Sequence, residues 1–211
     1  MDTGSAGDFT GCVSFLGYPV FFKEDHIYKV YGSIPSNFEV MGSATLGVAK
    51  GCGGSLAIAG ERLLYLSTSG VMIYSGGIPQ SLHDAFGMTR LRNGRAGSDG
   101  LKYYLSAQDE SGEWKLYVYD TRKGMWHIED KTHATHFCRY QGNTYFLTAE
   151  GKIALTGNIL DAPEGCTDEE DFTWFAETGD FTEKGSSQST SYDGVKKSIA
   201  KLWVRIEVAA G

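Results

Sequence analysis

Apolar and polar positions alternate along this chain in short runs, and the runs themselves repeat about every forty residues. In each repeat an apolar run follows a glycine, passes through a short polar turn and leads into a second apolar run. The four leading glycines, Gly17, Gly60, Gly100 and Gly142, are 43, 40 and 42 residues apart. Apolar runs of this length joined by a turn predict antiparallel β-hairpins. The chain is therefore expected to repeat one β unit four times.

The length of the repeat favours a β-propeller-like array, because one four-stranded propeller blade takes about 40 to 45 residues. Further apolar segments beside the hairpins, such as Phe9–Phe15 and Trp126–Glu129, supply the other strands of a blade. We therefore predict an all-β fold in which residues 1–158 form a propeller-like domain of about four blades, followed by a C-terminal β-strand extension. The blades are expected near residues 9–50, 51–90, 91–131 and 132–158.

The strand Trp114–Tyr119 in the third repeat has bulky side chains on both faces. Leu116 and Val118 lie on one face, and Tyr117 and Tyr119 lie on the other. A strand with one solvated face would alternate apolar with polar residues instead. This pattern predicts a sheet that is packed between two neighbouring sheets.

Two segments between the hairpins are less regular. Ser81–Phe86 follows the second hairpin and is interpreted as an outer strand. Arg90–Gly100 is the most basic and glycine-rich part of the chain, and it is interpreted as a solvated loop between blades, with an anion-binding loop as the alternative.

The repeat ends after Asn158. Residues 159–171 form an acidic linker, and residues 172–211 form the C-terminal β extension, with strands expected at 172–181 and 199–208. These strands either complete the fourth blade or begin a sheet whose remainder lies in a partner. The residues of this extension that we expect at an interface are Trp174, Trp203, Val204 and Ile206.

The composition changes this picture mainly by excluding partners. Among the 211 residues there are 28 glycines and only four prolines, which suits many short strands joined by tight turns. The formal net charge is −7, and no run of lysine or arginine offers a local exception. A nucleic acid would be repelled, so we expect no nucleic-acid partner.

The four cysteines, Cys12, Cys52, Cys138 and Cys166, are isolated from one another in the sequence. Four cysteines spread over a chain of this length predict buried thiols in a reducing compartment rather than a disulfide framework. The polar N-terminus lacks the features of a secretory signal, and no apolar stretch approaches the roughly 20 residues that span a bilayer. We expect no membrane partner and a protein made in a cytoplasm.

The sequence carries no nucleophile elbow, zinc-protease helix motif, P-loop or dinucleotide-binding fingerprint. Gly51–Ser55 is the nearest segment to a phosphate-binding loop, but the lysine that should follow is missing, and we interpret it as a turn. We expect no catalytic residue, no cofactor and no enzymatic activity.

Two histidines, His133 and His136, lie three residues apart, with His127 and Asp130 upstream, and so raise the question of a divalent metal. On a strand, residues three apart face opposite sides, whereas a metal site needs three or four convergent ligands. We therefore expect no metal site.

Asp109, Gly112 and Trp114 resemble part of the Asp-box turn found in sialidase blades. The spacing departs from that pattern, which also occurs only once here. We interpret the segment as a plain turn between two strands, so glycan hydrolysis is not favoured.

Several runs of the chain resemble virion structural proteins of tailed phages and prophages of gut Gram-positive bacteria. These runs are Val20–Gly32 with Pro35–Phe38, then Ser69–Gln80, and near the end Ala176–Phe181 with Lys196–Arg205. The resemblance covers most of the chain and consists of recurring structural segments rather than a catalytic signature. It implies a component of the virion or its tail.

Together these inferences predict a non-enzymatic phage or prophage virion structural protein, tail-associated, that serves as a protein–protein interaction scaffold. Its partners would be other virion subunits in an oligomer or larger assembly, and it would reach the virion from the bacterial host cytoplasm. The alternative is a carbohydrate-binding or glycan-processing propeller used in host recognition. The aromatic residues that fill blade cores or anchor interfaces are Tyr31, Phe38, Tyr74, Trp126 and Trp174.

Overall fold

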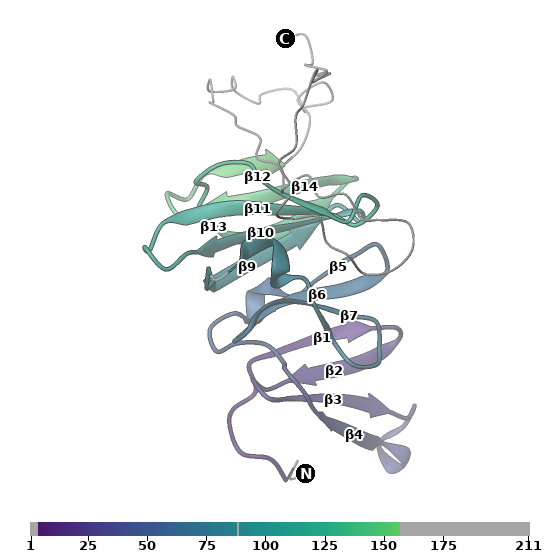
Figure 1. Cartoon of the computed structure of the whole chain (residues 1–211). Helices are drawn as coiled ribbons and strands as arrows, with labels where there is room; N and C mark the ends of the chain where they lie inside the picture. Colours follow the sequence, from purple (N-terminus) through teal and green to yellow (C-terminus); the bar gives the residue numbers. More distant parts are fainter. Residues whose placement is uncertain (1–3, 88, 157–211) are drawn as a thin grey trace, which may run out of the picture. The chain divides into compact units, whose positions relative to one another are not determined.

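The computed structural model describes residues 4–87 and 89–156, and these residues form four antiparallel β-sheets (Figure 1). Within this part of the chain the helical elements are three short 3-10 turns at Pro35–Asn37, Gly53–Ser55 and His83–Phe86. The prediction of an all-β fold with almost no helix is confirmed. The predicted linker 159–171 and extension 172–211 lie outside the described residues.

Each sheet is a meander in which neighbouring strands follow one another in the sequence. Sheet 1 consists of β1 (Gly11–Phe15), β2 (Tyr18–Phe22), β3 (His26–Tyr31) and β4 (Glu39–Ala44). Sheet 2 consists of β5 (Ala57–Ala59), β6 (Arg62–Ser67), β7 (Gly70–Tyr74) and β8 (Gln80–Ser81). Sheet 3 consists of β9 (Arg92–Ser98), β10 (Lys102–Gln108), β11 (Trp114–Asp120) and β12 (Met125–Ile128). Sheet 4 consists of β13 (Ala134–Tyr140), β14 (Asn143–Thr148) and β15 (Ile153–Thr156).

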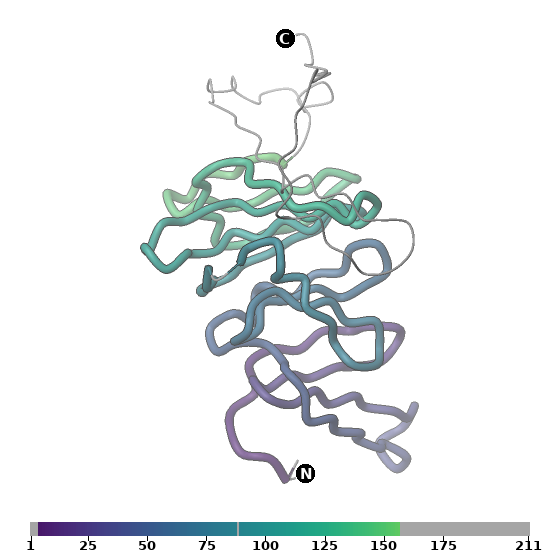
Figure 2. The backbone as a smooth tube through the Cα atoms, in the orientation of Figure 1, coloured from purple at the N-terminus to yellow at the C-terminus, as the bar shows by residue number. Residues whose placement is uncertain are grey.

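Consecutive sheets pack face to face through shared cores of buried side chains. The tube in Figure 2 shows the sheets following one another in sequence order. Between sheets 1 and 2, Phe22 contacts Tyr65 with ring centroids 5.2 Å apart. Sheet 3 contributes Tyr117 to the same core, whereas Val118 belongs to a second core that faces Phe137 of sheet 4. The prediction that β11 is buried on both faces is confirmed.

The first strands of the sheets lie next to one another. Strand β9 contacts both β5 and β13, and β1 contacts the 3-10 turn Gly53–Ser55 that precedes β5. The amide of Gly60, in the β5–β6 turn, donates a hydrogen bond to the carbonyl of Gly100, in the β9–β10 turn, over 2.8 Å. Each sheet therefore meets the next one through its first hairpin.

Two interpretations of the irregular segments are wrong. Residues 92–98 form strand β9 rather than a solvated loop. Its glycines are needed for close packing, because a Cβ on Gly94 would lie 2.9 Å from a methyl of Leu66. The expected strand Ser81–Phe86 pairs only over Gln80–Ser81 and then turns, which lets Phe86 pack edge-on against Tyr117 and Trp126.

Candidate interaction faces

Two sheet faces in the described part of the chain do not pack on another sheet. One belongs to sheet 1 and points away from sheet 2, and the other belongs to sheet 4 and points away from sheet 3. We call them the sheet 1 outer face and the sheet 4 outer face. Both follow from strand alternation, because the opposite sides of these sheets carry the buried residues Val20 and Phe22, and Ala134 and Phe146.

The sheet 1 outer face is formed by ten strand positions that the cross-strand register brings into rows. They are Cys12, Ser14, Pro19, Phe21, His26, Tyr28, Val30, Val40, Gly42 and Ala44. The sheet 4 outer face is formed by eight such positions. They are His136, Cys138, Tyr140, Asn143, Tyr145, Leu147, Ile153 and Leu155. Tyr140 and Ile153 are 63% and 76% exposed.

Neither outer face carries an aspartate, glutamate, lysine or arginine at any strand position. Charged residues make up 21% of the chain, so about four would fall on these 18 strand positions if they were placed without preference. Uncharged apolar faces of this kind are typical of surfaces that meet another protein. The two outer faces are therefore the candidate interaction surfaces.

Part of the sheet 1 outer face is covered by the residues that precede β1. The Phe9 ring packs edge-on against Phe21 and Tyr28, with centroids 5.8 and 6.0 Å apart. Ser5 contributes a side-chain hydrogen bond to the Tyr28 hydroxyl, and its carbonyl accepts one from the Lys23 ammonium over 2.7 Å. Tyr28 and Lys23 are buried as a result.

The connection between sheets 1 and 2 makes a comparable backbone contact with the second strand of sheet 2. The amide of Thr10 donates to the Phe22 carbonyl over 2.8 Å, and the amide of Ala49 donates to the Leu66 carbonyl over 3.0 Å. Phe22 and Leu66 occupy the same place in the second strands of their sheets. The residues before β1 therefore lie where an inter-sheet connection lies at an internal interface.

Two cysteines are exposed on the outer faces, Cys12 on β1 and Cys138 on β13. The prediction that the cysteines are buried is thus wrong for these two, because their strands turn them away from the packed sides. Cys52 is buried, and burial raises the pKa of its thiol. Cys166 lies outside the described residues.

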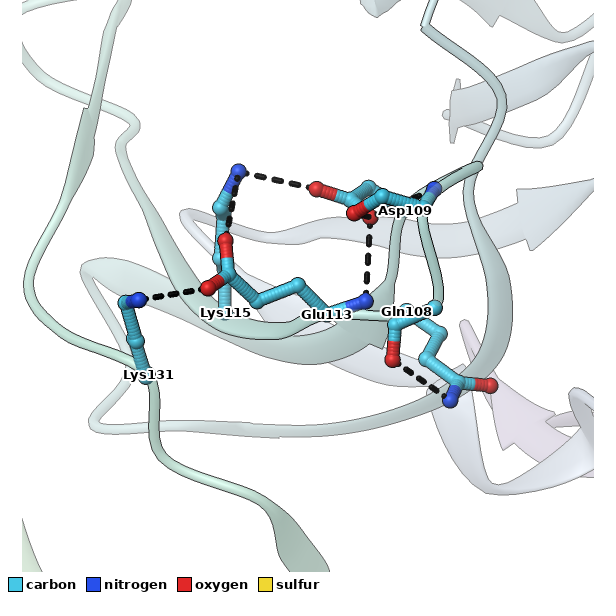
Figure 3. Close-up of polar contacts among 7 residues, drawn as sticks. Gln108, Asp109, Glu113, Lys115 and Lys131 are labelled. Carbon is cyan, nitrogen blue, oxygen red and sulfur yellow. Dashed lines mark hydrogen bonds and ion pairs between the residues drawn. The ribbon is translucent and has the colours of Figure 1, made fainter.

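The main cluster of charged side chains lies at the β10–β11 turn (Figure 3). The Asp109 carboxylate accepts hydrogen bonds from the amides of Ser111 and Glu113 over 2.9 and 3.1 Å, and from the Lys115 ammonium over 2.8 Å. Glu113 also forms ion pairs with Lys115 and with Lys131. The hydrogen bond from Lys115 is the main reason why the pKa of Asp109 is well below its usual range. This cluster fastens the turn.

The histidines that we considered as metal ligands lie in different environments. The His133 ring stacks on Trp114 with centroids 3.6 Å apart, while His136 lies exposed on the sheet 4 outer face. His127 lies 3.4 Å from a carboxylate oxygen of Glu129. Among residues 4–87 and 89–156, no group of three or more His, Cys, Asp or Glu residues is arranged to hold a metal.

The aromatic residues singled out in the sequence divide between core and surface. Tyr74 is buried, and Trp126 packs against Phe86, Tyr103 and Tyr119. Phe38 is 49% exposed. The expected interface residues lie outside the described residues, namely Trp174, Trp203, Val204 and Ile206. No helix in the described part of the chain is long and apolar enough to cross a membrane.

The sheet 4 outer face is the feature that sequence reasoning missed. The sequence did carry a signal, because Cys138, Tyr140, Tyr145 and Leu147 alternate with the residues that pack on sheet 3. The alternation that indicates two covered faces in β11 also indicates a second apolar side in β13 and β14.

The described fold and its faces define an all-β protein of consecutive antiparallel sheets with uncharged outer faces. No protein-family model and no curated protein matches the sequence. Among solved structures, the chain is similar to PorZ of Porphyromonas gingivalis, described as an essential bacterial surface component of the type-IX secretion system. The sequence identity is 16% and the TM-score 0.48, and the match covers 74% of this chain and 21% of the PorZ chain.

Proposed function

We propose that this protein is a non-enzymatic structural component of a tailed phage or prophage particle, associated with the tail, and that its sheets are propeller blades that serve as an interaction scaffold. The observation that carries the scaffold role is the pair of uncharged, apolar outer faces on sheets 1 and 4. Exposed apolar side chains such as Tyr140 and Ile153, on a face without charged strand positions, favour a partner protein that covers them.

The propeller architecture is supported by the way the sheets are built. Each is an antiparallel meander, consecutive sheets pack face to face, and the first strands of the sheets are neighbours. Propeller blades share these three properties, with the first strands lining the central channel. The chain would then supply part or all of a ring of blades.

A role in assembly also fits the charged groups that could otherwise serve in catalysis. Asp109 and Glu113 are engaged by Lys115 and Lys131 and hold a turn in place. Recognition or hydrolysis of glycans would instead call for carboxylates and arginines that converge on a channel mouth. The virion assignment itself rests on the resemblance of Val20–Gly32, Ser69–Gln80 and the C-terminal runs to virion structural proteins.

The virion assignment can be tested on particles. Particles released from the cell that carries the gene would be purified on a density gradient, and their proteins identified by mass spectrometry. We expect this chain in the tail-containing fraction at a fixed ratio to the other tail proteins, and portal or tail genes beside its gene. Its presence only in the soluble fraction, among genes unrelated to particles, would contradict the proposal.

A further inference from the structure

We propose that a second copy of this chain covers the two outer faces, packed head to tail so that the sheet 4 outer face of each copy lies against the sheet 1 outer face of the other. This inference rests on the proposed function, because it names the partner of the interaction faces. It is drawn from the way in which the first strands of neighbouring sheets pair inside one chain. The two outer faces could pair in the same way between two copies.

The hairpins that open the four sheets can be superposed by their register. In each hairpin, one cross-strand pair encloses four residues. These pairs are Ser14 with Pro19, Ile58 with Leu63, Ser98 with Tyr103 and Arg139 with Thr144. Counting back along the first strand, Phe137 of sheet 4 then corresponds to Cys12 of sheet 1, and Gly97 of sheet 3 corresponds to Cys138 of sheet 4.

The interface between sheets 3 and 4 brings Gly97 against Phe137. A Cβ placed on Gly97 would lie 2.5 Å from the Cβ of Phe137, so the two strands touch at this point. If sheet 1 of a second copy packs on sheet 4 as sheet 4 packs on sheet 3, Cys138 of one copy lies against Cys12 of the next. Both thiols are exposed, and each lies on the side of its sheet that this step requires.

The other internal interfaces use related positions. Ala57 of sheet 2 and Ala96 of sheet 3 correspond to Gly97 and Phe137, and both pack against the core that these sheets share. Between sheets 1 and 2, a Cβ on Gly11 would meet Leu56, which corresponds to Phe137. First strands thus meet near this position at each internal interface, although Gly11 lies two residues before the position that corresponds to Gly97.

The chemistry of the two outer faces suits this contact. Neither has a charged strand position that would lose its hydration on docking, so burial of Tyr140 and Ile153 is not opposed by desolvation of an ion. The residues that precede β1 already occupy the place of an inter-sheet connection, so they form part of the docking face and do not block it.

Two copies would be enough to close the head-to-tail arrangement into a ring. A head-to-tail contact closes into a ring when its rotation permits, and otherwise continues as an open array. The four sheets of the described residues make eight in a pair, which is the upper end of the usual range of about four to eight blades in a propeller. Closure at two copies covers both outer faces in both chains.

The test is cysteine cross-linking in the full-length chain, in a Cys166→Ser background. Copper-phenanthroline joins two facing thiols as a disulfide, removing one proton and one electron from each. We expect a covalent dimer from the background protein and none from the single variants Cys12→Ser or Cys138→Ser alone. Co-expression of the two single variants with different tags should restore a dimer that contains both tags. Buried Cys52 is present in all samples and controls for random oxidation.

The pattern of products separates the alternatives. A dimer from one single variant alone would mean that like faces meet, and a ladder of larger species would mean an open array. A monomer whose Cys138 resists a thiol reagent would mean that another part of the same chain covers the face. Each of these results would overturn the proposal.

A second measurement does not depend on thiols. Ile153→Glu places a charge on the sheet 4 outer face and should halve the mass measured by light scattering, without changing the circular dichroism spectrum. Ile78→Glu is the matched control, because Ile78 is 85% exposed and lies off both faces, so the mass should stay that of a dimer. A wild-type monomer that is nonetheless found in particles would overturn only this inference. Absence from particles would overturn the proposed function, whatever the mass.

Discussion

Gly97 on β9 lies directly against Phe137 on β13, because a Cβ built on Gly97 would fall only 2.5 Å from the Phe137 Cβ. Gly97 does not have the positive backbone φ that favours glycine, so the constraint is one of space alone. Phe137 packs with Tyr104, Leu116 and Val118, and so cannot move away freely.

Gly97→Ala should therefore destabilise the protein by about 1 to 3 kcal/mol, because the added methyl group overpacks this contact. The free energy of unfolding would be measured by urea denaturation. Gly77→Ala is the matched control, since a Cβ at Gly77 meets nothing within 4 Å. Equal effects of the two substitutions would mean that sheets 3 and 4 do not pack closely at this point.

Tyr103→Phe tests the junction of sheets 2 and 3. The fully buried Tyr103 hydroxyl donates a hydrogen bond to the Ser55 carbonyl over 2.8 Å, and burial raises the pKa of this hydroxyl. Removing it leaves a buried carbonyl with one bond fewer, at a cost of about 1 to 2 kcal/mol. Tyr18→Phe, at a half-exposed tyrosine, should change the free energy of unfolding by much less. A Tyr103→Phe protein as stable as the wild type would contradict the contact.

The ion pair of Asp109 and Lys115 predicts how the stability depends on pH. The pKa of Asp109 is lowered on folding, mainly by the Lys115 hydrogen bond, so its contribution is complete above the usual carboxyl pKa of 3.8 and is lost as the pH falls through the lower folded value. The pKa of Lys115 is raised by the same bond, so its contribution is complete below 10.5 and is lost as the pH rises through the higher folded value.

Asp109→Asn should accordingly lower the thermal midpoint at pH 7, and the difference from the wild type should shrink as the pH falls below 3.8. Calorimetry over this range measures it. Glu110→Gln, in the same turn and exposed, is the matched control and should behave like the wild type. If the difference in thermal midpoint between Asp109→Asn and the wild type grew as the pH fell, the ion pair would not be what stabilises the folded protein through Asp109.

The sequence predicted the secondary structure well where both sides of a strand are regular. Strand β11 illustrates this, because its alternating Leu116 and Val118 against Tyr117 and Tyr119 reported burial on both faces. Strand β9 was missed because Gly94 and Gly97, which look like loop residues, are required by contacts with Leu66 and Phe137 from other sheets. Such contacts have no local signature. The propeller arrangement and the virion role stay predictions.

The candidate faces were hard to predict for a related reason. Whether Cys138 or Tyr140 is covered depends on which sheet comes next, and alternation along β13 says only that two sides exist. The spacing of the cysteines therefore could not predict that Cys12 and Cys138 are exposed. Spacing gives information on disulfide frameworks and metal sites, but not on which side of a strand is packed.

Phe9→Ala tests whether the residues before β1 hold the sheet 1 outer face together. The Phe9 ring is 54% exposed, yet it contacts Phe21, Tyr28 and the Lys23 ammonium. Its truncation should cost about 1 to 2 kcal/mol, less than for a fully buried ring, and should speed hydrogen exchange at the Thr10 amide, which is bonded to the Phe22 carbonyl.

Ile34→Ala is the matched control for this substitution, because Ile34 is also 54% exposed but lies in the connection between β3 and β4. Its loss should leave exchange at Thr10 unchanged and cost less than the loss of Phe9, since no aromatic contact is removed. If the two substitutions had equal effects and Thr10 exchanged at the same rate in both, the residues before β1 would be a loose tail. The sheet 1 outer face would then lack the connection that makes it resemble an internal interface, and the head-to-tail contact would lose that support.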